Sequence, residues 1–199
     1  AMHPDFWDVG EELSRLKDAG ILGVKLHPVY QGVNADDERY VKIFSLAREL
    51  GLIVLIHAGY DIGFPGNDAA HPERISRALE KSGGVKIILA HMGGWKIWQE
   101  AEKIFSGREN IFIDTAFSTG LIPAKNNFYS DDEMKLLDAE NFMKLYKIFG
   151  ADRILFGTDS PWMPPNMPLD FINALPIDDD DKKKIFGLNA AKLLDMDAD

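Results

Sequence analysis

Short apolar runs alternate with amphipathic segments along this chain. The apolar runs lie near residues 22, 53, 86, 111 and 154, and each has the length of a buried strand. The segments between them carry apolar residues at helical spacing, as at Val9, Leu13 and Leu16. Strict alternation of strand and helix predicts an α/β fold with a parallel sheet and helices outside it.

Capping residues, prolines and glycines mark the ends of the predicted helices. Helices are expected at about 8–19, 36–50, 72–82, 94–105, 140–149, 169–174 and 179–194. Residues 1–3 resemble the end of a further strand, and the stretch after His27 and the stretch 61–70 are expected to be loops. Residues 116–137 have no clear periodicity and are predicted to form a long insertion after a strand, where loops of this length are often functional.

Three of the predicted strands end on a side chain that can bind a metal. The run from Ile154 leads to Asp159, the run from Ile53 leads to His57, and the run from Lys86 leads to His91. Because the carboxyl ends of parallel strands meet at one edge, these three side chains are expected to converge. Imidazoles and carboxylates hold divalent metals in hydrolytic sites, so the pattern favours metal-assisted chemistry. The alternative is that each histidine only forms a hydrogen bond with a neighbouring turn. That alternative would account for a single strand ending in this way, but it accounts less well for three strands that end alike.

Other residues are weaker candidates. His91 is either a ligand or a general base, since Gly93 and Gly94 beside it permit a close approach. Lys25 and His27 lie two apart on a strand and are predicted to share one side, where Lys25 meets a substrate carboxylate, is carbamylated to bridge two metals, or forms a salt bridge. Trp162 follows the Asp159 turn and is a candidate wall of a substrate pocket, whereas His71 before Pro72 is expected to be a surface or capping residue.

Composition narrows the class of protein. The 199 residues are 46% hydrophobic and 27% charged, as in an ordinary globular domain, so one domain over 1–199 is expected. A net charge of −10 argues against binding to nucleic acid or to an anionic membrane. The chain has no cysteine, no apolar run near the roughly 20 residues that span a bilayer, and no signal-like start. A cytoplasmic enzyme with a small-molecule substrate is the expectation.

Five motifs, taken in order, resemble the amidohydrolase-related family of metal-dependent TIM-barrel hydrolases and decarboxylases. The motifs are Gly23-Val-Lys-Leu-His-Pro, Leu55-Ile-His-Ala-Gly, Leu89-Ala-His-Met-Gly-Gly, Phe156-Gly-Thr-Asp-Ser-Pro-Trp and Asn189-Ala-Ala-Lys-Leu-Leu. The resemblance implies a (β/α)8 barrel in which His57 binds metal and His91 is a second ligand or the catalytic base. It also implies that Asp159 binds metal and orients the attacking water, and that Asn189 is structural.

One departure from the family's pattern concerns the first barrel strand, which carries a His-x-His metal pair. No two of the five histidines of this chain have that spacing. A (β/α)8 barrel also needs eight strands and about 250 residues, and only five full strands are predicted here. We therefore expect the chain to be the C-terminal portion of a longer barrel. Exposed strand edges would favour association, so a homo-oligomer is predicted.

Three functions follow from the resemblance and the residues. The leading one is metal-dependent hydrolysis of a C–N or C–O bond in a small molecule, with Asp159 or His91 moving the proton. The second is non-oxidative decarboxylation, in which His91 protonates the carbanion. The third is a non-catalytic barrel fragment that has lost its metal pair. For either enzyme the expected cofactor is a divalent metal, zinc first and manganese second.

Overall fold

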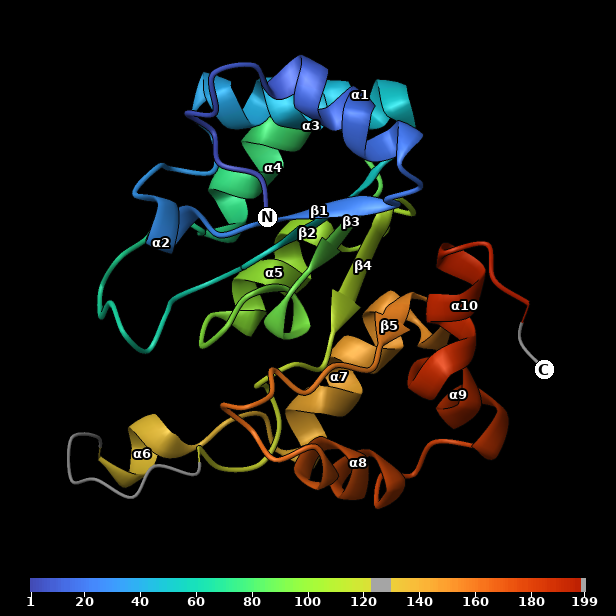
Figure 1. Cartoon of the computed structure of the whole chain (residues 1–199). Coiled ribbons are helices and arrows are strands. Elements are labelled where there is room, and N and C mark those ends of the chain that lie inside the picture. Colours follow the sequence, from blue (N-terminus) through green and yellow to red (C-terminus); the bar gives the residue numbers. More distant parts are fainter. Residues whose placement is uncertain (123–129, 198–199) are drawn as a thin grey trace. The chain divides into compact units, whose positions relative to one another are not determined.

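The computed structural model describes residues 1–122 and 130–197, and Figure 1 labels their elements. The chain divides into two compact units, Ala1–Phe112 and Ile113–Asp199, with the boundary inside β4 (Ile111–Asp114). Among the helices that the structure describes, none has the length and apolar character needed to cross a bilayer. A single domain over 1–199 stays a prediction, and the two units are described in turn.

Three parallel strands form the sheet of the first unit. They are β1 (Gly23–Leu26), β2 (Ile53–Ile56) and β3 (Ile87–Leu89), and β2 pairs with both of the others. The register sets Leu26 opposite Ile56 and Ile56 opposite Leu89, so all three strands end at the same level. The residues that follow each strand therefore emerge at one edge of the sheet.

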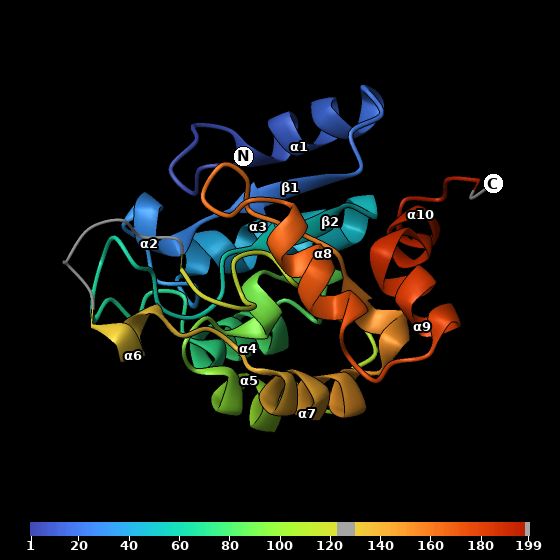
Figure 2. The same ribbon diagram turned by 90° about the horizontal axis from the view of Figure 1, so that it is seen from below.

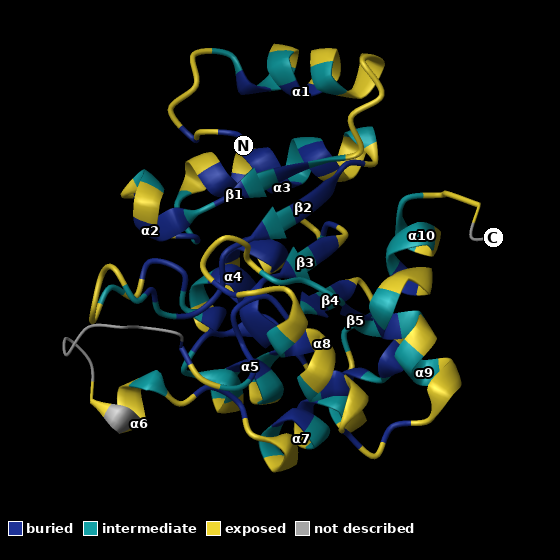
Figure 3. Ribbon diagram, turned by 60° about the horizontal axis from the view of Figure 1, so that its bottom comes forward, coloured by how far each residue is buried: buried dark blue, intermediate teal, exposed yellow. Residues whose placement is uncertain are grey.

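The helices of the first unit pack in sequence against one another. They are α1 (Val9–Asp18), α2 (Pro28–Gln31), α3 (Glu38–Leu50), α4 (Pro72–Lys81) and α5 (Trp98–Phe105). Helix α1 packs on α3, α3 on α4 and α4 on α5, an order that is visible in Figure 2. Their inner faces bury large apolar side chains such as Leu13, Phe44 and Phe105, whereas the outer turns of α1 are exposed in Figure 3.

Polar side chains cap these helices, although α3 is capped by Asp37 and not by Asp36, where the sequence placed the start of that helix. Asp8 and Asp37 accept main-chain hydrogen bonds at the starts of α1 and α3. His71 does the same at the start of α4, where its Nδ1 accepts from the amide of Glu73. Of the two roles predicted for His71, surface or capping residue, the structure confirms the capping role.

The second unit is built on a short parallel pair. Strand β5 (Ile154–Leu155) pairs with β4, with Ile113 opposite Ile154. The helices are α6 (Asp131–Met134), α7 (Ala139–Phe149), α8 (Asn166–Asn173), α9 (Asp179–Lys183) and α10 (Asn189–Leu193). Buried Asn189 donates from Nδ2 to the carbonyls of Ala151 and Ile154, at 2.6 and 2.8 Å, and so fixes α10 to the start of β5.

Several predicted boundaries in the first unit are wrong for local reasons. Residues 1–3 form no strand, although the amide of Met2 donates to the carbonyl of Lys25. The expected loop after β1 contains α2, because the ring of His27 caps it. Helix α5 begins at Trp98 instead of residue 94, because the main chain of Trp95 pairs with the segment around Gly59 and so is not free to join the helix.

Other differences fall in the second unit. Strand β5 has two residues rather than the longer apolar run, and the helical segment after residue 179 contains a π-helical turn, Lys184–Leu188. In the predicted insertion 116–137, residues 123–129 lie outside the described part of the chain. Within the rest of it, α6 begins with a capping box between Ser130 and Glu133, a signal that the sequence prediction overlooked.

Candidate functional site

Three histidines meet at the carboxyl edge of the first unit's sheet. His27 and His57 directly follow β1 and β2, and His91 lies just beyond β3. The rings of His27 and His57 are stacked, with centroids 4.1 Å apart and planes 14° from parallel. The ring of His91 meets that of His57 edge on, with Nε2 of His91 3.0 Å from Nδ1 of His57. The aligned strand ends thus place the three imidazoles in one row.

The hydrogen bonds of His57 define its protonation. Its Nε2 lies 3.1 Å from the carbonyl oxygen of Tyr60, and a carbonyl can only accept. The Nε2 atom therefore carries the proton, and Nδ1 accepts from Nε2 of His91. Only 4% of His57 is exposed, and this burial, together with nearby His91, His27 and Lys25, holds the pKa of His57 well below its usual range. His57 is accordingly a neutral imidazole.

The environment of His27 is similar but more open. Burial, with the nearby positive charge of Lys25, lowers the pKa of His27 to about 4. Its Nδ1 accepts a long hydrogen bond of 3.4 Å from the amide of Tyr30. The ring of Tyr30 contacts His27 edge on and also contacts Phe64, and both of these aromatic side chains are exposed. His27 is therefore the more exposed end of the row of histidines, and two exposed aromatic rings lie next to it.

Asp61 completes this cluster, and the sequence prediction missed it. Its carboxylate is buried, and Oδ1 accepts from the amide of Gly63 at 2.7 Å. Its Oδ2 lies 3.7 Å from Nε2 of His27 and 3.8 Å from Nε2 of His57. Burial raises the pKa of the Asp61 carboxyl. The only sequence signal was its spacing of four residues from His57, in a stretch that reads as an ordinary glycine-rich loop.

The donor set of this cluster fits a divalent metal. One ligand atom from each of His27, His57 and Asp61 lies within 4.8 Å of the others. Two ligands bound at roughly 2.0–2.2 Å from one ion are at most about 4.4 Å apart, so the two separations between Asp61 and the imidazoles are compatible with a shared ion. Two imidazoles and one carboxylate are also a donor set of catalytic zinc sites.

Main-chain contacts join the segments that carry His57 and His91. The amide of Trp95 donates to the carbonyl of Ala58, and the amide of Tyr60 donates to the carbonyl of Trp95. The indole Nε1 of Trp98 donates to the carbonyl of His91 at 2.9 Å. The turn at His91 has a positive φ of 60°, a backbone conformation uncommon for residues other than glycine. Contacts between segments distant in sequence therefore fix the histidine row.

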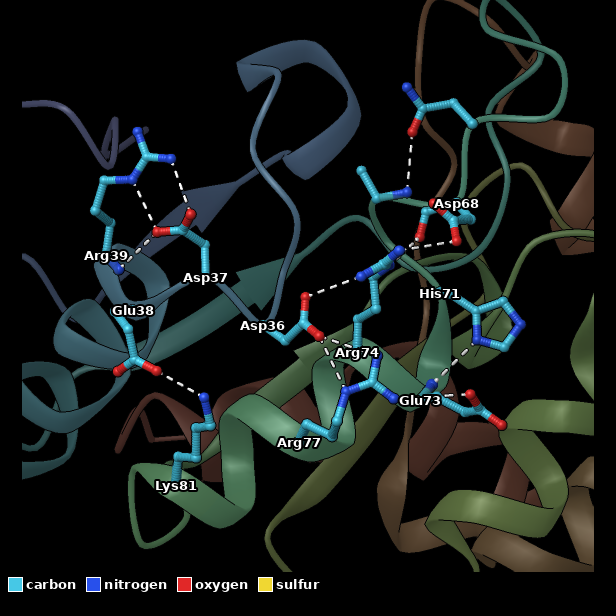
Figure 4. A network of polar contacts seen from close by, with 12 residues as sticks. Asp36, Asp37, Glu38, Arg39, Asp68, His71, Glu73, Arg74, Arg77 and Lys81 are labelled. Carbon is cyan, nitrogen blue, oxygen red and sulfur yellow. Dashed lines mark hydrogen bonds and ion pairs between the residues drawn. The ribbon is translucent and has the colours of Figure 1, made fainter.

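A charged network holds the loop that carries Asp61. Arg74 of α4 donates to the carboxylates of Asp36 and Asp68 and to the carbonyl of Asp68, and Figure 4 shows these contacts. Arg77 also reaches Asp36 from the next turn of α4. The far end of the loop is thus fixed to α4 and to the segment preceding α3.

The remaining predicted site residues divide between the two units. Lys25 lies in β1, close enough for its charge to lower the pKa values of His27 and His57. Asp159 lies in the second unit, after β5, with a positive φ of 59° and an exposed position. Trp162 is 69% exposed, and its amide donates to the carbonyl of Asp159. The convergence of Asp159 with the histidines, and the site roles of all these residues, stay predictions.

The sequence matches a known protein family. Residues 8–196 match the family model described as amidohydrolase. No curated protein matches the chain.

Solved structures show the same fold. An uncharacterized TIM-barrel protein from Bordetella bronchiseptica is 24% identical with a TM-score of 0.73, over 93% of this chain and 61% of that one. A dihydroxybenzoic acid decarboxylase from a Polaromonas species, with bound manganese, is 20% identical with a TM-score of 0.64, over 97% and 66%. A proposed 2-pyrone-4,6-dicarboxylic acid hydrolase from Pseudomonas putida is 15% identical with a TM-score of 0.66, over 100% and 71%.

These likenesses establish the fold alone, since each identity is low. They confirm the predicted (β/α)8 fold class. The chain spans 61% of the length of the Bordetella protein and 66% of that of the Polaromonas protein. Whether its barrel lacks N-terminal strands stays a prediction.

Proposed function

Since this chain belongs to the amidohydrolase family, we propose that it carries active-site residues of a metal-dependent enzyme that hydrolyses a C–N or C–O bond in a small molecule. One observation carries the proposal: three imidazoles, joined by stacking and a hydrogen bond, lie at the carboxyl edge of parallel strands. Enzymes of this fold build their active sites at that edge. The manganese in a structural relative supports a divalent cofactor, for which we propose zinc, with manganese as the alternative.

The proposed roles follow from the chemistry of each side chain. We assign His57 and Asp159 as metal ligands and His91 as a further ligand or the general base. A bound divalent cation would lower the pKa of water to about 7 and polarise a substrate carbonyl. The hydrogen bond between His57 and His91 fixes the orientation of both rings.

The charges at the site favour an anionic substrate. Lys25 is close enough to both His27 and His57 for its positive charge to lower their pKa values, and a positive charge at the site attracts an anionic group. The names of two structural relatives also specify carboxylic acids. We therefore propose a small carboxylate substrate bound by Lys25 and His27, with Trp162 as a wall of the pocket.

A second candidate is decarboxylation, which the same placement of Lys25 and the decarboxylase among the structural relatives favour. In that reaction the substrate's carboxylate carbon leaves as CO₂, and the electron pair left on the ring carbon takes a proton from His91. The residues are the same, so only the products separate the two reactions. For either reaction we also propose that the protein is a homo-oligomer and that it is located in the cytoplasm.

Product analysis tests the proposal. The chain, supplied with Zn²⁺ or Mn²⁺, is incubated with lactones, amides and aromatic carboxylic acids in H₂¹⁸O, and products are identified by mass spectrometry. Hydrolysis puts ¹⁸O into the product, whereas decarboxylation removes 44 mass units, the mass of CO₂, without the label. Asp159→Asn should abolish turnover with an unchanged circular dichroism spectrum, because an amide neither takes a proton nor balances the metal's charge.

The control variant is Asp170→Asn, which changes an exposed carboxylate on α8. It should leave turnover unchanged. Undiminished turnover in Asp159→Asn would refute the assignment of that residue. An absence of every product while the metal is bound would instead favour the third hypothesis, a non-catalytic barrel fragment.

A further inference from the structure

We propose that the first unit itself binds a divalent cation between His27, His57 and Asp61. This set adds His27 and Asp61, which the family resemblance does not assign to the metal. The inference rests on the proposed function in one respect, since His57 serves as a ligand in both. The inference differs from the proposed function in the source of the other ligands. Here every ligand lies within residues 27–61, at the edge of one sheet and in the loop after β2.

The environment of the Asp61 carboxylate carries the argument. Its side chain is only 9% exposed, and its Oδ1 is fixed by the amide of Gly63. Its Oδ2 faces two imidazole nitrogens at 3.7 and 3.8 Å, which is too far for a hydrogen bond. A buried carboxylate is costly unless it is paired or coordinates a metal. An ion between Oδ2 and the two nitrogens would balance the charge of this carboxylate, and the separations of 3.7 and 3.8 Å are ones that ligands of a single ion have from each other.

The surroundings of His57 suit a ligand. Metal-binding histidines usually donate their second ring N–H to an acceptor that fixes the ring, and Nδ1 of His57 already contacts His91. With the ion on Nε2, the proton of His57 would sit on Nδ1 and be donated to Nε2 of His91, whose own proton would then sit on its Nδ1, so both rings would change tautomer. The carbonyl of Tyr60, 3.1 Å from Nε2, loses its hydrogen bond and becomes available as a further oxygen ligand.

His27 supplies the second imidazole and the route for the ion. Its ring lies nearly parallel to that of His57, and the Nε2 atoms of both rings lie within 3.8 Å of the same oxygen, Oδ2 of Asp61. If Nε2 of His27 binds the ion, its Nδ1 must carry the proton. His27 then loses the long hydrogen bond that Nδ1 accepts from the amide of Tyr30. The side chain of His27 is 26% exposed, which gives an ion access from solvent to a cluster that is otherwise buried.

Zinc titration tests the inference. The whole chain is freed of metal, and Zn²⁺ binding is followed by isothermal titration calorimetry, with stoichiometry checked by native mass spectrometry. We expect one Zn²⁺ per chain. Asp61→Asn and His27→Gln should each weaken binding more than about tenfold, since even residues that only orient a ligand cost about 10–100-fold in affinity. The matched controls are Asp170→Asn and His3→Gln, which change exposed side chains and should bind as the wild type does.

Each outcome separates this inference from the proposed function. Weaker binding in both cluster variants supports the inference, whatever Asp159→Asn does. Unchanged binding in both, with binding lost in Asp159→Asn, overturns the inference and leaves the ligand set of the proposed function in place. A wild-type chain that binds no zinc also overturns it. If Asp61→Asn fails to fold by circular dichroism, His27→Gln decides, and the absorption of bound Co²⁺ reports directly whether an imidazole has been lost.

Discussion

Replacing Gly59 with alanine should displace the segment that carries His57 and Asp61. Gly59 has a φ of +94°, and a Cβ atom there would lie 2.1 Å from the amide nitrogen of Trp95 and 2.6 Å from its carbonyl oxygen. Those atoms belong to the backbone, so no side chain can rotate to relieve the clash. The segments can only separate, which breaks the two main-chain hydrogen bonds that join residues 58 and 60 to Trp95.

The expected cost follows from these two effects. A residue with a Cβ at positive φ costs about 1–2 kcal/mol. The two lost hydrogen bonds add about 0.5–1.5 kcal/mol each. Gly59→Ala should therefore lower the free energy of unfolding by about 2–5 kcal/mol, a large fraction of the roughly 5–15 kcal/mol typical of a folded protein.

Gly66→Ala is the matched control in the same loop. Gly66 also has a positive φ, +78°, but nothing lies within 4 Å of the position of its Cβ. It should cost only the strain of about 1–2 kcal/mol. Guanidinium unfolding followed by tryptophan fluorescence compares the two, and equal losses of stability would refute the argument that the contact with Trp95 makes this glycine necessary.

Three further predictions concern other parts of the chain. Asn189→Ala should lower the free energy of unfolding by about 2–4 kcal/mol, because two buried carbonyls lose their donor. Urea unfolding measures this loss, and the control Asn173→Ala, at an exposed position, should change the stability little. The guanidinium of Arg39 lowers the pKa of the Asp37 carboxyl from its ordinary 3.8 to about 2. The contribution of this carboxylate to the stability of the fold is therefore complete above pH 4 and is lost as the pH falls toward 2. Asp37→Asn should thus cost about 1 kcal/mol at pH 7 and less than half of that at pH 2, and equal costs at both would contradict this. Arg74→Lys cannot bridge Asp36 and Asp68 as a planar fork does, so loop 61–70 should be cleaved faster in limited proteolysis while cleavage elsewhere is unchanged.

The sequence predicted the histidine edge because the relevant information is local. An apolar run followed by a histidine and a glycine or proline predicts where a strand ends, and alternation with helices makes the strands parallel. Parallel strands then bring His57 and His91 to one edge without any knowledge of loops, whereas the predicted convergence of Asp159 with them stays a prediction and His27 was only a weaker candidate. The same reasoning found the capping role of His71, since a cap acts on the residues next to it.

The loops were less predictable because distant contacts fix their paths. Asp61 reads as one more polar residue before a glycine, yet the segment between Gly59 and Asp68 is held by Trp95 and Arg74, which lie far along the chain. The turn at His91 gave no sequence signal for its positive φ. Neither the burial of Asp61 nor its approach to the two imidazoles follows from local spacing.

Local pattern thus determined the strands, the helices and the residue types at the edge of the sheet, because hydrophobic periodicity and caps act over a few residues. Tertiary structure alone decided that His27 stacks on His57, that His91 donates to His57, and that Asp61 lies beside both rings. Those relations depend on strand register and on the packing of loops from separate parts of the chain, and both are set only when the sheet edge is assembled.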